Sequence, residues 1–203
     1  MLRHRIKNLF HRTRKYMNKI TKHVLKYPKG EEPDFILPQK YGRYRYALGK
    51  KGTNPLVAIC MNLVAICMNP SAAKEDSSDM TINRVISASE KLNHDGWIVF
   101  NLYPERATDA KNLEEFNEAI SKENIDIIRR FLIEHKIKEV WGAWGNAKGI
   151  ETLRLAKKDI FNMLSEISVR VFYFGTLSKE GNPRHPLQRN EKVVFADNCK
   201  KYL

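Results

Sequence analysis

The apolar positions of this chain fall into two alternating patterns. Continuous apolar runs bounded by turn residues predict buried strands, and they lie at 63–69, 97–102, 139–144 and 169–175. Stretches whose apolar residues recur every three or four positions predict helices, and they lie at 81–92, 113–135, 148–164 and 191–202. Because strands and helices alternate, the pattern predicts right-handed βαβ units and a parallel sheet.

These elements predict one α/β domain. The alternating side chains of RYRYAL at 43–48 predict a further short strand before the first buried one. Ser78 or Asp79 is placed to cap the helix at 81–92. We therefore expect a single domain at 30–203, with a four-stranded parallel sheet flanked by helices.

The N-terminal segment carries most of the positive charge. Residues 1–29 contain ten Lys and Arg and no acidic residue, so they contribute +10 of a formal net charge of +13. Their apolar residues recur at helical spacing, which predicts a basic amphipathic arm. Three interpretations stay open: an arm that binds nucleic acid, a helix on a membrane surface, and a solvated extension. Residues 27–38 are rich in Pro, Gly and acid and indicate a linker.

A heptapeptide is repeated at the first buried strand. The sequence LVAICMN occupies 56–62 and again 63–69 without change. Fourteen residues in one strand would span roughly 46 Å, whereas strands usually span about 17–20 Å. Only the second copy precedes Pro70. We therefore predict that 63–69 forms the central strand and that 56–62 is displaced into a hairpin arm or loop.

Composition excludes several classes of protein. Hydrophobic residues make up 42% of the 203 residues and charged residues 29%, which is typical of one globular domain. No apolar run reaches the roughly 18 residues of a membrane span, and no apolar signal segment follows the basic N-terminus. Cys60, Cys67 and Cys199 lack the spacing of a zinc site. We expect a cytoplasmic protein without a metal or another cofactor.

Polar residues follow the predicted strands at the positions where open α/β sheets bind ligands. They are Asn69 with Ser71, Asn101, Trp144 and, after the last strand, His185. Structural interpretations compete: Asn69 with the following proline is a frequent turn, and tryptophan commonly packs in cores. Asn101 lies in an apolar run, so its amide requires a partner, which is either a ligand or loop backbone.

Five motifs stand out along the chain: RYRYALG at 43–49, MNPSAAKEDSSDMT at 68–81, NLYPERATD at 101–109, GAWG at 142–145 and GNPRHPL at 181–187. Together these motifs resemble those of a bacterial and phage family called domain of unknown function 1643. The similarity extends from about residue 41 to the C-terminus and omits the basic arm. The family pattern contains one copy of LVAICMN, and the family name implies no activity.

The order of the motifs also resembles that of the uracil-DNA glycosylase superfamily. There the first strand leads into G-Q-D-P-Y or G-I-N-P-G, the second ends in asparagine, the third ends in Trp-Gly, and His-Pro-Ser follows the fourth. The corresponding sequences here are CMNPS at 67–71, VFNL at 99–102, WGNAK at 144–148 and HPL at 185–187. The resemblance implies a four-stranded parallel sheet flanked by helices.

This second resemblance implies roles for the strand-end residues. As catalytic groups, Asn69 would hold a water near the glycosidic carbon and His185 would donate to a pyrimidine carbonyl. Asn101 would read the Watson–Crick edge of an extruded base, with Ser71 and Trp144 beside it. The predicted contacts to DNA phosphates are Lys148, Arg184 and Arg189.

Departures from the glycosylase pattern favour recognition over excision. Asn69 is not an aspartate, the serine after His-Pro is absent, and no aromatic residue follows in 72–79. The leading hypothesis is a glycosylase-like protein that binds DNA, single-stranded rather than duplex, with weak, altered or no base excision. The alternatives are an active glycosylase or nucleosidase on a modified base, and a module that binds a protein partner.

Overall fold

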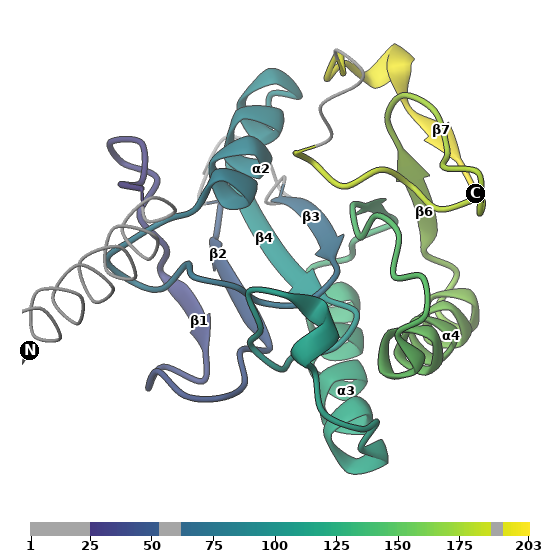
Figure 1. Ribbon diagram of the computed structural model, residues 1–203. Coiled ribbons are helices and arrows are strands. Elements are labelled where there is room, and N and C mark those ends of the chain that lie inside the picture. Colours follow the sequence, from purple (N-terminus) through teal and green to yellow (C-terminus); the bar gives the residue numbers. More distant parts are fainter. Residues whose placement is uncertain (1–24, 53–61, 188–192) are drawn as a thin grey trace, which may run out of the picture.

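The computed structural model describes residues 25–52, 62–187 and 193–203, which form a mixed α/β fold (Figure 1). A single sheet has the strand order β1-β2-β4-β3-β5-β6-β7. Its strands are β1 (Phe35–Leu37), β2 (Ala47–Lys50), β3 (Asn62–Cys67), β4 (Gly96–Asn101), β5 (Glu139–Gly142), β6 (Arg170–Tyr173) and β7 (Lys201–Tyr202). The α/β class predicted from the sequence is confirmed.

The predicted size of the sheet is wrong. The four strands β4, β3, β5 and β6 pair in parallel at its centre, but β1, β2 and β7 extend it to seven strands by antiparallel pairing. β1 lies inside the segment predicted to be a linker. Its Phe35 and Leu37 pack against the buried core, so this part of the segment belongs to the domain. These three antiparallel strands are only two to four residues long, too short to show a clear period along the sequence.

Three helices cover the two faces of the sheet (Figure 1). α2 (Met80–Lys91) packs on one face, and α3 (Glu118–Glu134) and α4 (Glu151–Glu166) pack on the other. Successive strand residues point to opposite faces. In β4, Trp97 and Val99 belong to the core on the α2 side, whereas Ile98 and Phe100 belong to the core on the α3 and α4 side.

Polar caps set where the first two of these helices begin. The Asp79 side chain accepts a hydrogen bond from the backbone N–H of Ile82 at 2.9 Å, which confirms Asp79 as the cap of α2. Asn117 caps α3 in the same way through the N–H of Ile120, so this helix begins at Glu118 and not at 113. The cap of α2 places a carboxylate beside the carboxyl end of the central strand.

The second copy of the heptapeptide forms the central strand, as predicted. β3 lies between β4 and β5 and contains residues 63–67 of that copy. Asn62, the last residue of the first copy, also belongs to β3, and its Oδ1 accepts from the backbone N–H of Gly52 at 2.8 Å. The rest of the first copy lies outside the described residues, as does the helix predicted for the basic arm up to residue 24.

The predicted C-terminal helix is wrong. Residues 193–196 are irregular, and a short 3₁₀ turn (Asp197–Cys199) leads into β7. Phe195 inserts into the core on the α2 side, edge-on to Trp141 at 5.4 Å and to Phe174 at 5.2 Å between ring centroids. Burial of this one aromatic ring and pairing with β6 replace the helical hydrogen bonds expected from the apolar spacing.

The chain that precedes β1 packs onto the domain. Leu25 and Ser78 exchange two backbone hydrogen bonds, and the ring of Tyr27 stacks on that of Trp97 at 6.0 Å. The Tyr27 hydroxyl donates to the carbonyl oxygen of Lys74 at 2.7 Å. These contacts fasten the loop before α2. No helix within the described ranges is long and apolar enough to cross a membrane.

Candidate functional site

A cavity of about 310 Å³ opens at the carboxyl ends of β3 and β4, beside the first turn of α2. Its volume is at the lower end of the range for small-ligand pockets, about 300–1,000 Å³. Its polar lining includes Arg45, Asn69, Ser71, Asp79, Asn101 and His185. The structure therefore brings together four of the residues that the sequence analysis singled out at separate strand ends, which are Asn69, Ser71, Asn101 and His185.

Asn101 ends β4 and contributes an unpaired amide to this cavity. Strand alternation directs its side chain to the α2 side, because Phe100 before it belongs to the opposite core. Asn101 is only 1% exposed. Among the described residues, neither its Nδ2 nor its Oδ1 has a hydrogen-bond partner. An unsatisfied buried amide costs about 1–3 kcal/mol, and the described loop backbone does not supply its partner.

Asn69 holds two loops together at the mouth of the cavity. Its Nδ2 donates to the carbonyl oxygen of Ala107 at 2.7 Å and to that of Pro70 at 3.1 Å. The backbone N–H of Ala107 returns a bond to the Pro70 carbonyl at 2.9 Å. The amide donors of Asn69 are thus used within the protein, and its Oδ1 is the atom left to accept from a water or ligand.

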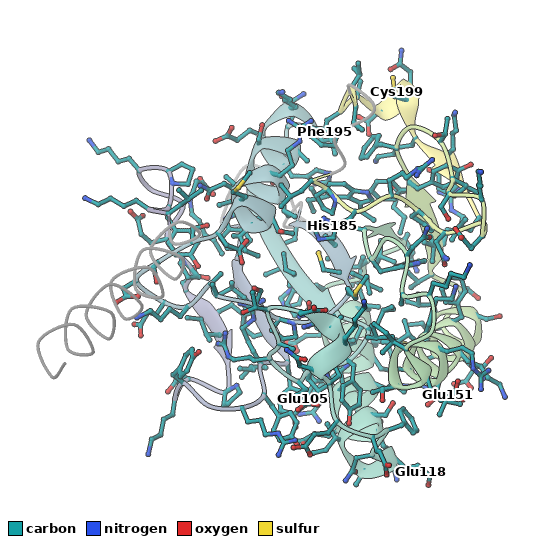
Figure 2. The ribbon with its side chains drawn as sticks, viewed as in Figure 1. Glu105, Glu118, Glu151, His185, Phe195 and Cys199 are labelled. Carbon is teal, nitrogen blue, oxygen red and sulfur yellow. The ribbon has the colours of Figure 1, made fainter. Side chains whose placement is uncertain are left out.

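His185 is held at the cavity by the end of β5. The backbone N–H of Gly145 donates to the carbonyl oxygen of Pro183 at 3.1 Å, and a Cβ on Gly145 would lie 3.0 Å from the Cβ of His185. Nδ1 of His185 accepts from the backbone N–H of Leu187 at 3.3 Å. The neutral imidazole therefore carries its proton on Nε2 and can donate it. Figure 2 shows His185 beside α2 and β3.

Burial lowers the pKa of His185 below its ordinary value of 6.5, against a smaller opposing effect of Asp79. The imidazole is consequently neutral near pH 7. In that state it can donate one hydrogen bond to a carbonyl oxygen without bringing a positive charge into the cavity.

We expect His185 to make the protein less stable in acid. Between the lowered native pKa and 6.5, the unfolded chain binds more protons than the native protein. The stability from this group is therefore present above pH 6.5 and lost as the pH falls through the native pKa, by at most about 1.4 kcal/mol per pH unit. The free energy of unfolding, measured in urea from about pH 7.5 to about pH 5, should fall less steeply with decreasing pH in His185→Gln than in the wild-type protein. Equal slopes in both proteins would contradict this assignment.

Two charged residues of the cavity were missed as site residues by the sequence analysis. Asp79 was expected only as a helix cap, but it also lines the cavity wall. Arg45 lies in the alternating segment with Arg43, and no sequence signal distinguishes the two. Arg45 is 2% exposed and lines the cavity, whereas the side chain of Arg43 is half exposed and pairs with Glu105 at 3.0 Å.

The thiol of Cys67 also lines the cavity but is unsuited to be a nucleophile. Burial raises its pKa to about 12, so the thiolate is not populated near neutral pH. No group of three His, Cys, Asp or Glu within the described parts of the chain is arranged to hold a metal ion. The chemistry available to the cavity is therefore hydrogen bonding by amides, hydroxyls and imidazole, with one carboxylate and one guanidinium.

The remaining predicted residues lie elsewhere. Trp144 packs on the α3 and α4 side, edge-on to Phe161, and its Nε1 donates to Oδ1 of Asn182 at 3.3 Å. It lines a second cavity, of about 300 Å³, together with the exposed Lys148. The structure thus does not bring Trp144 together with Asn101. Arg184 is exposed and donates to the carbonyl oxygen of Thr176 at 3.3 Å, and Arg189 lies outside the described residues.

Comparison with known proteins gives one match. The model of a family described as "Protein of unknown function (DUF1643)" matches residues 45–187, which include the complete lining of the cavity. No curated protein and no solved structure matches the chain. The matched segment begins at Arg45 and ends two residues after His185, so both ends of the family region contribute to the cavity.

Proposed function

The chain belongs to the DUF1643 family, and we propose that it binds DNA, single-stranded rather than duplex, by accepting one base in the cavity of Asn101. The observation that carries the proposal is the amide of Asn101, buried in the cavity wall with a donor and an acceptor that no described residue satisfies. The Watson–Crick edges of bases present donors and acceptors side by side, which is the pattern that an amide complements.

The neighbouring groups support a base as the ligand. Nε2 of His185 is available to donate to a base carbonyl, and Oδ1 of Asn69 is available to accept. Asn69, Asn101 and His185 are also the residues to which the glycosylase resemblance gives roles in water and base binding. These three residues line one cavity, as the proposed roles require, while the antiparallel strands β1, β2 and β7 extend the sheet beyond the glycosylase pattern.

Single strands fit the site better than duplex. Extrusion of a base from a duplex costs a few kcal/mol of stacking and pairing, and enzymes that extrude bases often read them between aromatic side chains. The cavity is lined by no aromatic residue other than His185 within the described chain. Lys148 and Arg184 are exposed in the loops after β5 and β6, and we propose them as contacts to strand phosphates outside the cavity.

The test separates base recognition from general attraction to phosphate. The full chain is titrated with a fluorescent DNA strand and with a strand of the same length that has abasic sites throughout. Both carry the same charge, so the basic arm binds them equally. We expect the normal strand to bind at least tenfold more tightly. Equal affinities would reject the proposal and favour the alternative in which this fold binds a protein partner.

Base excision is a second candidate because a carboxylate and a neutral imidazole line the same cavity. Asp79 could orient a water toward a sugar, and His185 could stabilise charge on a departing base. Release of bases from uracil-containing and modified single strands decides this point. Asp79→Asn is the informative variant, because asparagine also caps helices well and preserves α2. Base release by the wild-type protein that is lost in Asp79→Asn would establish excision. If the wild-type protein releases no base from any strand, excision is ruled out.

A further inference from the structure

Arg45 is a buried cation for which the described residues supply no ion-pair partner. Its side chain is 2% exposed, and the described residues place no carboxylate within ion-pair distance of its guanidinium. Nη1 donates to the carbonyl oxygen of Ala73 at 2.7 Å, while Nε has no hydrogen-bond partner among the described residues. Buried charges are normally paired, because desolvation of an isolated ion is expensive.

A second guanidinium increases this excess of positive charge. Nη1 of Arg106 donates to the carbonyl oxygens of Ser71 and Ala73, each at 3.0 Å, so both arginines bind the same Ala73 oxygen. Nε of Arg106 also has no partner within the described chain. Burial, and then the charge of Arg106, lower the pKa of Arg45 to about 10. The native protein therefore holds two like charges together under the loop that follows β3.

Anchoring of the loop does not account for this arrangement. A neutral donor would satisfy the Ala73 carbonyl without the cost of a buried charge. Asp79 is near enough to oppose the lowering of the Arg45 pKa but makes no ion pair with it, and its Oδ1 caps α2. A guanidinium offers a planar fork of donors, which matches the oxygens of a phosphate. Arg45 lines the same cavity as Asn101.

We infer that Arg45 forms a phosphate subsite in the cavity, so that the ligand is a nucleotide unit and not a base or nucleoside alone. The inference rests on the proposed function of the same cavity. Asn101 would bind the base, and Arg45 would bind a phosphate attached to the same sugar. A phosphate there supplies the counter-charge and the acceptors that the buried guanidinium lacks.

The experiment compares 2′-deoxynucleosides with their 5′-monophosphates by calorimetry on the full chain, at constant ionic strength. We expect the wild-type protein to bind the matching monophosphate at least tenfold more tightly than the nucleoside. Arg45→Gln should reduce this ratio to about one. Arg43→Gln is the matched control, since Arg43 lies two residues away with its ion-pair partners outside the cavity lining, and it should keep the ratio.

The outcomes separate this inference from the proposed function. Nucleosides that bind as well as monophosphates to the wild-type protein, or a ratio that persists in Arg45→Gln, would overturn the subsite and leave base binding intact. A wild-type ratio near one overturns the subsite even where Arg45→Gln fails to fold. A methyl phosphodiester of the nucleotide then identifies the source of the bound phosphate. If Arg45 increases the affinity for diester and monoester equally, the natural ligand is a DNA strand. If it increases the affinity for the monoester alone, the ligand is a free nucleotide.

Inorganic phosphate provides a test that does not depend on a base. Phosphate should raise the melting temperature of the wild-type protein above that in chloride of equal ionic strength, and Arg45→Lys should reduce the increase. No phosphate-specific increase would count against the subsite. A phosphate-specific increase in melting temperature that is lost in Arg45→Lys would support the subsite. If normal and abasic strands also bind equally, the subsite stands and base recognition is rejected.

Discussion

Replacement of Asn101 by leucine is expected to increase the free energy of unfolding by about 1–3 kcal/mol and to abolish the preference for a normal strand over an abasic one. The substitution removes a buried donor and acceptor without partners and puts an apolar group of similar size in their place. Urea unfolding and strand titration on the same protein would measure both effects. A gain in stability with a loss of binding is the expected signature of a residue kept for its ligand.

Asn124 provides the matched control. It is also fully buried, but its Nδ2 donates to the carbonyl oxygens of Asn101 at 3.0 Å and Leu102 at 3.3 Å, and among the described residues only its Oδ1 lacks a partner. Asn124→Leu should therefore lower the free energy of unfolding by about 1–3 kcal/mol, because it removes this donor from both carbonyls. Destabilisation of similar size in both variants would show that Asn101 has a structural partner, and the argument for base recognition would lose its main support.

Gly145→Ala is expected to lower the free energy of unfolding by about 2–4 kcal/mol and to weaken base-dependent binding. Gly145 has φ +70°, a left-handed conformation that costs an alanine about 1–3 kcal/mol. The new Cβ would also meet the Cβ of His185 at 3.0 Å, which adds strain or displaces the imidazole. Chemical denaturation and the strand titration would measure the two effects.

Gly149 separates the backbone cost from the contact with His185. It has φ +77°, and a Cβ there would meet nothing within 4 Å. Gly149→Ala should therefore cost only the strain of the left-handed conformation, about 1–3 kcal/mol, and leave base-dependent binding unchanged. If the two alanine variants behave alike, then Gly145 does not position His185.

The central strands and their polar ends were predictable because their signals are local. Each parallel strand is a continuous apolar run, and a strand buried on both faces needs one. The residues after β3 and β4 could then be assigned to one edge of the sheet from the topology of βαβ units alone. This reasoning identified Asn69, Ser71, Asn101 and His185, which the structure places around one cavity.

The failures of sequence reasoning share one cause, which is that long-range contacts override local pattern. Apolar spacing near the C-terminus predicted a helix, but Phe195 is buried between rings from β5 and the end of β6. Trp144 was expected at a strand end like Asn101, yet it lies beyond the end of β5 and packs on the opposite face of the sheet. One residue of register decides the face, and the sequence does not fix it.

The sequence by itself determined the class of fold and the choice of the second heptapeptide copy for the central strand, and it narrowed the cap of α2 to Ser78 or Asp79, because periodicity, strand length and cap chemistry act over a few residues. Only the tertiary structure decided that Arg45 is buried while Arg43 is exposed, and that the amide of Asn101 is left unpaired. Burial and hydrogen-bond satisfaction depend on residues far apart in the chain. For this reason the charged and unsatisfied groups that define the site emerged only once the fold was complete.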